Sequence, residues 1–322
     1  MVENSGVTAG AVGYTGPLYD SHAHLVSADQ DRYPRNVPKL DPPKDGGPFI
    51  RPPFGPGTLG IPGGMHGPAP INEKPSAEKM AQWMAETNVV GMAAVQKGMI
   101  YWIDNSYIID SAAAYPGKMT AVIILDPAAP ETPAMMRDLN KRGAVSVRFF
   151  PVNVDDKAAW LTSPLALEIW ALADELGMVV DLEAPPYDAH LLHPTVEMIA
   201  DLFPKLQIAL DHIFMPVVTA PDYGIDAVFD GFAARDTITY KFTSLNMDYI
   251  REAGVAPEKV LRRAVDFFGA DKVMWGSDIG TSSGTYHEMV ERAIASTALL
   301  TEDERRKVLH DTGRRVFTGW TG

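Results

Sequence analysis

The sequence predicts an α/β protein with the fold of a (β/α)₈ TIM barrel, in which eight parallel strands form a ring inside a ring of helices. Eight short apolar segments recur along the chain, and each is followed by a segment with helical periodicity. These apolar segments do not alternate with polar residues, which indicates strands covered on both faces. The length of 322 residues also suits a barrel, which takes about 250 residues before insertions. We therefore expect one domain spanning residues 1–322.

The first strand is predicted over residues 18–24, after a glycine-rich segment, residues 1–16, that we expect to be flexible. The strand ends in two histidines, His22 and His24, with one residue between them. Alternation along a strand turns both imidazoles to the same side. Because the active site of a barrel lies at the C-terminal ends of its strands, this pair can form half of a metal or oxyanion site.

Residues 26–75 form a long insertion rich in proline and glycine after the first strand. Proline clusters such as residues 51–56 prevent regular secondary structure. A loop of this length is usually a functional lid or a linker. Its apolar residues, among them Tyr33 and Phe54, favour a lid that packs on the barrel. The alternative is an arm that joins subunits, which leaves a homo-oligomer open.

Helices and strands alternate regularly beyond this insertion. Ser76 is a suitable N-cap for the first helix, Pro116-Gly117 follow the second, and Gly177 closes a later one. A doubly wound open sheet is the alternative fold, but no glycine-rich phosphate loop follows the first strand. The other predicted strands cover residues 89–96, 119–125, 144–149, 178–182, 206–211, 237–242 and 272–275. The predicted helices cover residues 76–86, 104–115, 132–141, 164–176, 194–203, 225–233, 257–268, 286–299 and 302–317.

The composition favours a globular protein whose partner is a small molecule. A net charge of −13 would repel nucleic acid and anionic membranes, although a local basic pocket can still hold a small anion. No segment approaches the roughly 18 apolar residues needed to cross a bilayer. The N-terminus lacks the basic and apolar regions of a signal peptide, so we expect a cytoplasmic protein.

The absence of cysteine restricts the chemistry. Disulfides, a thiolate nucleophile and any zinc site built on sulfur are excluded. Any metal must therefore be held by histidine and carboxylate side chains.

Polar side chains follow the predicted strands at corresponding positions, where a barrel would bring them together. Alone, His212 would be a core histidine and Asp278 the N-cap of a helix. Four such groups at matching strand ends instead favour a shared site made by His22, His24, His212 and Asp278. Further polar residues at these ends are Gln96, Lys97, Asp126, Arg148, Glu183, Tyr187 and Lys241.

Buried cations in this set need anionic partners. Alternation places Arg148 on an inward face, and an unpaired guanidinium there is costly. Its partner is either Glu183 or a carboxylate of the substrate. Lys241 poses the same question, with a structural ion pair preferred.

Several motifs together resemble the amidohydrolase superfamily, and more narrowly its lactonase branch, which includes 2-pyrone-4,6-dicarboxylate lactonase and the sugar-acid lactonases. The similarity extends over residues 17–317, without most of the insertion. The motifs are residues 19–24 (YDSHAH), 104–107 with 115–118, 125–127, 143–148, 210–212 (LDH) and 275–278 (WGSD).

This resemblance implies a hydrolytic site. Asp278 would be the base that takes a proton from water, while the histidines His22, His24 and His212 would polarise the carbonyl or orient the water. The anionic substrate would be bound by Arg148, with Tyr187, Lys241 and Glu183 as further contacts.

Two departures bear on the metal. The positions that carry a bridging lysine and a fifth-strand histidine in binuclear members hold Arg148 and Glu183 here, which argues against a binuclear centre. The resemblance to the pyrone lactonase favours a site that requires no cofactor. The alternative is a single Zn²⁺ ion held by His22, His24 and Asp278.

The predicted function is hydrolysis of a lactone or similar cyclic ester, from the breakdown of aromatic compounds or sugar acids. The alternative is a metal-dependent decarboxylase, or a hydrolase of carbon–carbon bonds, acting on an aromatic or unsaturated acid. A binding protein without catalysis is disfavoured, because it would not need four titratable groups at one mouth.

Overall fold

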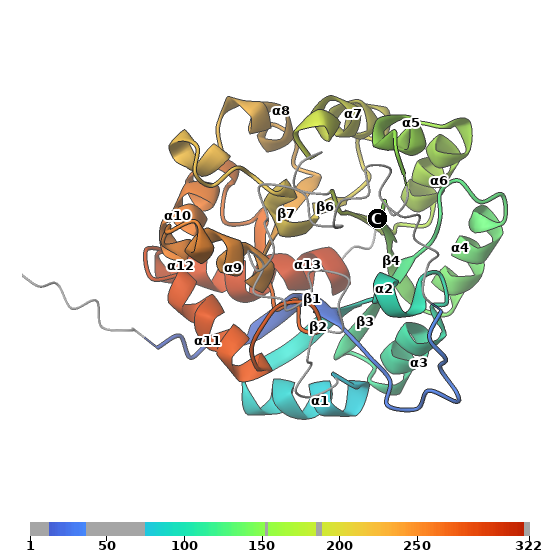
Figure 1. Ribbon diagram of the computed structural model, residues 1–322, viewed down its shortest axis with the longest axis horizontal. Coiled ribbons are helices and arrows are strands. Elements are labelled where there is room, and N and C mark those ends of the chain that lie inside the picture. Colours follow the sequence, from blue (N-terminus) through green and yellow to red (C-terminus); the bar gives the residue numbers. More distant parts are fainter. Residues whose placement is uncertain (1–12, 37–74, 152–153, 185–188, 319–322) are drawn as a thin grey trace, which may run out of the picture.

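The computed structural model describes residues 13–36, 75–151, 154–184 and 189–318. Eight parallel strands form one sheet in which each strand pairs with the next along the chain, and the sheet curls into a barrel surrounded by helices (Figure 1). The strands are β1 (Leu18–His24), β2 (Val89–Val95), β3 (Met119–Ile124), β4 (Ala144–Phe149), β5 (Val179–Leu182), β6 (Ile208–Leu210), β7 (Ile238–Thr243) and β8 (Val273–Gly276). The predicted (β/α)₈ barrel is confirmed.

Hydrogen bonds between β1 and the segment that directly follows β8 join the two ends of the sheet. The backbone N–H of Asp278 donates to the carbonyl of His22 at 2.7 Å, and His24 N–H donates to the carbonyl of Ile279 at 3.2 Å. The buried carboxylate of Asp20 also accepts from the N–H of Ser277 at 2.8 Å. This seam places the end of β1 directly beside the segment that follows β8.

The helices surround the barrel, and the last of them also packs two side chains into its interior. They are α1 (Ala77–Glu86), α2 (Gly98–Tyr101), α3 (Ser106–Ala114), α4 (Thr132–Lys141), α5 (Lys157–Leu161), α6 (Pro164–Glu175), α7 (Ala189–Leu202), α8 (Asp230–Ala233), α9 (Ser244–Glu252), α10 (Pro257–Phe268), α11 (Tyr286–Ser296), α12 (Glu302–Arg306) and α13 (Thr312–Thr318). Over the part of the chain that the structure describes, none of them is long and apolar enough to cross a bilayer.

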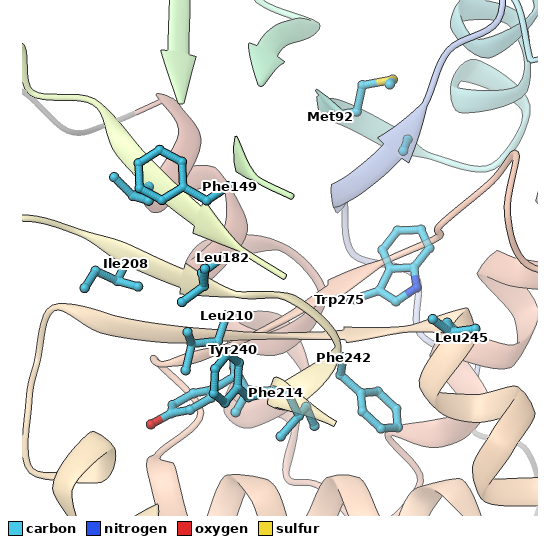
Figure 2. Close-up of a cluster of buried hydrophobic side chains, with 14 of the residues drawn as sticks. Met92, Phe149, Leu182, Ile208, Leu210, Phe214, Tyr240, Phe242, Leu245 and Trp275 are labelled. Atoms are coloured by element: carbon cyan, nitrogen blue, oxygen red, sulfur yellow. The ribbon is translucent and has the colours of Figure 1, made fainter. Parts of the chain in front are cut away.

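Side chains alternate along each strand between the inside and the outside of the barrel, so the apolar residues form two separate layers. Outward-facing side chains pack against the helices: the ring of Phe149 lies 4.7 Å from that of Trp170 in α6, and Tyr240 stacks on Phe268 in α10 at 3.8 Å. Figure 2 shows part of this layer, with Phe149 of β4, Leu182 of β5 and Tyr240 of β7 among its labelled side chains. A smaller cluster fills the barrel interior: Tyr19, Ala93, Val95, Val122, Val179, Ala209 and Met274, with Val316 and Phe317 of α13. The interior is therefore packed below the polar strand ends.

Most predicted elements are present, and Ser76 caps α1 by accepting from the N–H of Lys79. The helix predicted to begin at Pro194 instead begins at Ala189, because the first turn is held by buried contacts such as the stacking of His193 on Phe232. The prediction for residues 225–233 was too long: a 3₁₀ turn, Ala227–Phe229, leads into the four-residue α8.

Two further differences concern the second half of the chain. Helix α9 was not predicted; a capping box between Thr243 and Asn246 starts it. The single helix predicted over residues 302–317 is divided into α12, a π-helical turn at Lys307–Asp311, and α13.

The described part of the insertion packs on the barrel. The chain leaves at Val26 and returns at Pro75, where the Val26 N–H donates to the Pro75 carbonyl at 3.0 Å. Between them, the hydroxyl of Tyr33 donates to Asp110 of α3 at 2.7 Å, and Asn36 N–H donates to the carbonyl of Ile100 of α2. Residues 1–12 and 37–74 lie outside the described residues, so the flexible start and the lid stay predictions.

Candidate active site

A small pocket opens at the C-terminal ends of the strands. Its polar lining comes from strand ends all around the barrel, and its apolar lining comes from the loops and helices that follow them. The lining residues are His24, Lys97, Gly98, Met99, Arg148, Phe150, Glu183, His212, Leu245, Asp278 and Thr281. This is the mouth at which barrel enzymes carry their active sites.

His24 and Asp278, which line this pocket, meet His22 at the edge of the barrel interior. Oδ1 of Asp278 lies 3.2 Å from Nε2 of His24 and 3.6 Å from Nε2 of His22. The two imidazole rings are 5.0 Å apart and nearly perpendicular. All three side chains are buried. The seam between β1 and the segment that follows β8 produces this convergence.

The donor atoms of this cluster fit a cation. His24 Nδ1 lies 3.0 Å from the carbonyl oxygen of Val95, so Nδ1 carries the proton of a neutral ring and Nε2 presents a lone pair to Asp278. Nε2 of His22 is buried without a hydrogen-bond partner in the described part of the chain. Burial lowers the pKa of His24 to about 4 and that of His22 well below its usual value, so both rings are neutral at pH 7.

His22, His24 and Asp278 thus form a suitable ligand set for one metal ion, since their ligand atoms all lie within 4.8 Å of one another. Two neutral imidazoles and a carboxylate are ligands that Zn²⁺ takes in catalytic sites.

Asp278 is held in a strained backbone conformation. Its φ of +52° is left-handed, which is uncommon for a residue other than glycine and occurs mainly at functional sites. The N–H groups of Thr281 and Ser282 donate to its carbonyl, and the Ser282 hydroxyl donates to Oδ2 at 2.9 Å. Burial by itself raises the pKa of this carboxyl, but in acid the protonated ring of His24 donates to it, and the charges of His24, His22 and His212 bring its pKa below the usual value. Asp278 is therefore ionised at neutral pH.

His212 stands in a left-handed turn that directly follows β6. Residues 212–215 all have φ between +50° and +55°. The side-chain amide of Asn246, in α9, donates to the His212 carbonyl at 2.9 Å and holds this turn. Nδ1 of His212 is bonded to the hydroxyl of Thr243 at 2.7 Å, which leaves Nε2 for the pocket. The ring lies 5.3 Å from that of His22.

A buried ion-pair network lies beneath these groups. Nε of Arg148 donates to Asp211 at 2.8 Å, and its Nη2 donates to Glu183 at 2.7 Å. Lys241 pairs with Asp181 and lies 3.1 Å from Asp211. Asp211 also lies 3.2 Å from Nδ1 of His22. This carboxylate therefore connects two cations with the ring that faces Asp278.

The pKa values of this network follow from burial and pairing. Burial raises the pKa of Asp181 to about 6, against the opposing effect of Lys241. Burial also raises the pKa of Glu183, although Arg148 opposes it. For Asp211, burial alone would raise the pKa, but its cationic neighbours and His22 bring it well below the usual value. Asp211 is thus the fixed negative charge of the site.

The structure brings together His22, His24, His212, Asp278, Arg148, Glu183 and Lys241, all candidates from the sequence. Tyr187 lies outside the described residues. The sequence left open whether Arg148 and Lys241 pair with protein carboxylates or with the substrate. In the structure both form ion pairs within the protein, Arg148 with Glu183 and Lys241 with Asp181.

Two contributors, Asp181 and Asp211, were not predicted as site residues. Lys97, which the sequence places at a strand end without a role, also lines the pocket. The sequence does contain a pattern that could have identified Asp181. Asp181 lies two positions before Glu183, and therefore on the same inward side of the strand. A charged residue on the inward side of an apolar strand needs a partner of opposite charge.

The fold and the site define a barrel enzyme of the hydrolase class. The chain matches the amidohydrolase family model over residues 19–318 and therefore belongs to the amidohydrolase family. No curated protein sequence matches the chain.

Solved structures share the fold. An amidohydrolase from Burkholderia multivorans with bound zinc is 16% identical, with a TM-score of 0.69 over 94% of this chain and 99% of that one. A probable 2-pyrone-4,6-dicarboxylic acid hydrolase from Acinetobacter baumannii with bound citric acid is 16% identical, with a TM-score of 0.65 over 93% and 98%. A 4-oxalomesaconate hydratase from Rhodopseudomonas palustris is 14% identical, with a TM-score of 0.58 over 93% and 95%.

Proposed function

We propose that this protein hydrolyses a lactone, or a similar cyclic ester, of a carboxylated small molecule. The observation that carries the proposal is the ionised carboxylate of Asp278, held at the bottom of the pocket within 3.2 Å of His24 and facing the space that a substrate would enter. Similarity to a protein described as a pyrone-dicarboxylic acid hydrolase supports it.

In the proposed reaction, a water molecule attacks the ester carbonyl and Asp278 takes its proton. Each carboxylate oxygen carries two lone pairs, so Asp278 can accept this proton while it keeps the bond from Ser282. The tetrahedral intermediate then collapses, the ring C–O bond breaks, and Asp278 returns the proton to the leaving oxygen. The ring of His212, oriented by Thr243, lines the pocket where the carbonyl oxygen gains charge.

A metal ion fits this proposal. His22, His24 and Asp278 would hold one divalent ion such as Zn²⁺, which when bound would polarise the carbonyl and acidify water. The sequence favours a site that requires no metal. The unpartnered Nε2 of His22 instead favours a site that binds one.

The test is a screen of lactones with a pH indicator, with and without a chelator, on wild type and Asp278→Asn. We expect acid release from at least one lactone, and a fall in kcat of about 10²- to 10⁴-fold in the variant, the usual contribution of a general base. Asp126→Asn is the matched control, because Asp126 follows β3 but does not line the pocket. An Asp278→Asn variant as active as wild type would overturn the assignment of the base.

The alternative, decarboxylation or carbon–carbon bond cleavage of an aromatic or unsaturated acid, is also supported by the fit of the ligand set to a metal. Release of CO₂, or of two carbon fragments, in place of acid release from a lactone would select it.

A further inference from the structure

Lys97 occupies one wall of the pocket, next to the proposed base. It lies two residues after the end of β2, at the N-cap of α2, and its Nζ donates to the hydroxyl of Thr281, in the loop after β8. The N–H of Thr281 in turn donates to the carbonyl of Asp278 at 3.1 Å. The ammonium group therefore stands beside the segment that carries Asp278.

The other two cations at these strand ends are already neutralised by protein carboxylates. Arg148 binds Glu183 and Asp211, and Lys241 binds Asp181 and Asp211. Lys97, in contrast, has only the neutral hydroxyl of Thr281 as its hydrogen-bond partner within the described ranges. An ammonium group has three N–H donors, so two remain for a ligand.

The surroundings of Lys97 favour an anion. Burial lowers its pKa to about 8, so the side chain is still largely protonated at pH 7. The carboxylates of Asp278 and Glu183 act on this charge, but among the described residues its hydrogen-bond partner is a neutral hydroxyl. A carboxylate from the substrate would supply a directly hydrogen-bonded counterion.

The apolar lining limits what can carry the carboxylate. Met99, Phe150 and Leu245 border the same pocket, and the Phe150 ring is fixed beneath the guanidinium of Arg148 at 5.1 Å. Such a wall packs well against a flat unsaturated ring and poorly against a polyhydroxylated one.

We propose that Lys97 is the specificity-determining residue of this site: it binds a carboxylate on an unsaturated ring whose face lies on Phe150, and so directs the ester carbonyl toward Asp278. This inference rests on the proposed lactone hydrolysis for the identity of the reacting group. The carboxylate site itself can be tested without turnover.

The binding test uses two flat probes of nearly equal shape, benzoate and neutral benzamide, measured by calorimetry on the full-length protein. The variants are Lys97→Met, which removes the charge, and Lys97→Arg, which keeps it. Lys141→Met, on the exposed surface of α4, is the matched control.

Wild type should bind benzoate more tightly than benzamide. Lys97→Met should weaken benzoate binding by about 10- to 100-fold, the loss typical of a charged hydrogen bond, and leave benzamide unchanged. Lys97→Arg and Lys141→Met should stay within a few-fold of wild type. Equal benzoate affinity in wild type and Lys97→Met, or no preference of wild type for benzoate, would overturn the proposal.

A turnover experiment separates this proposal from the proposed function. With 2-pyrone-5-carboxylate and its methyl ester as lactones, Lys97→Met should raise KM for the acid alone. If neither lactone nor any other is hydrolysed while benzoate binding depends on Lys97, the reaction is wrong and the carboxylate site stands. If a lactone is hydrolysed while benzoate binding does not depend on Lys97, the reaction stands and the carboxylate site is wrong.

Discussion

Nδ1 of His22 lies 3.2 Å from Oδ1 of Asp211, although one residue is in β1 and the other follows β6. The same carboxylate binds Arg148 and Lys241, so its position is fixed from three sides. A carboxylate behind an imidazole fixes the orientation of the ring. Asp211 thereby turns Nε2 of His22 toward Asp278.

Asp211→Asn should destabilise the protein strongly. The change removes the negative charge shared by Arg148 and Lys241, and the loss of one partner from a buried pair costs about 3–5 kcal/mol. Urea unfolding would measure the difference. Asp201→Asn is the control: Asp201 bonds Arg235 at 2.8 Å but is exposed, so its loss should cost less than about 1 kcal/mol. Equal effects of the two changes would contradict the assigned role of Asp211.

Gly276→Ala should disturb the site through packing alone. A Cβ atom at Gly276 would lie 2.6 Å from Cβ of His22 and 3.0 Å from its backbone nitrogen. The collision should cost about 1–3 kcal/mol and displace the ring, so activity should fall with stability. Gly13→Ala, where nothing lies within 4 Å of the added atom, is the control. Thermal melts together with activity would check this, and an alanine variant with wild-type behaviour would refute it.

Removal of a metal ion from the site formed by His22, His24 and Asp278 should be reversible. After dialysis against a chelator, calorimetric titration with Zn²⁺ should give one equivalent bound by wild type. His24→Gln removes one of the three ligands and should weaken binding at least about tenfold, as losses at metal sites usually do. His287→Gln, an exposed histidine on α11, should bind like wild type. Retention of full affinity by His24→Gln would exclude this ligand set.

Lys97→Met should stabilise the protein near pH 7, since burial lowers the pKa of Lys97 from 10.5 to about 8. Below pH 8 the lysine is protonated in both the folded and the unfolded chain, so the full cost of burying the charge is present. Between pH 8 and 10.5 the folded chain has released the proton that the unfolded chain still holds, and this cost disappears.

The melting temperature of Lys97→Met should therefore exceed that of wild type at pH 7, and the gap should narrow by pH 10. Lys141→Met should show no such trend. A lower melting temperature for Lys97→Met at pH 7 would assign Lys97 a structural role instead.

The barrel and the convergence of its histidines with Asp278 could be predicted because both depend on local patterns. Continuous apolar strands identify the fold, and the position directly after a strand identifies the mouth. The links among the buried charges could not be predicted, because the sequence does not show which strands face each other across the interior. Arg148 and Asp211 meet there at 2.8 Å, one from β4 and the other beyond β6.

The left-handed turn at residues 212–215 was also beyond prediction. It contains no glycine or asparagine, the residues that usually mark such conformations. Its support comes from Asn246, a tertiary contact that local sequence does not reveal.

The protein can be active only when the barrel is closed, because the junction between β1 and the segment after β8 brings the catalytic side chains together. An open sheet would contain every reactive side chain and still bring none of the β1 histidines to Asp278. Joining the first strand to the segment after the last one closes the longest loop in the barrel, and contacts so distant in sequence form late. In a refolding experiment, helical ellipticity should recover before turnover does. The time at which activity returns would therefore report when the barrel closes.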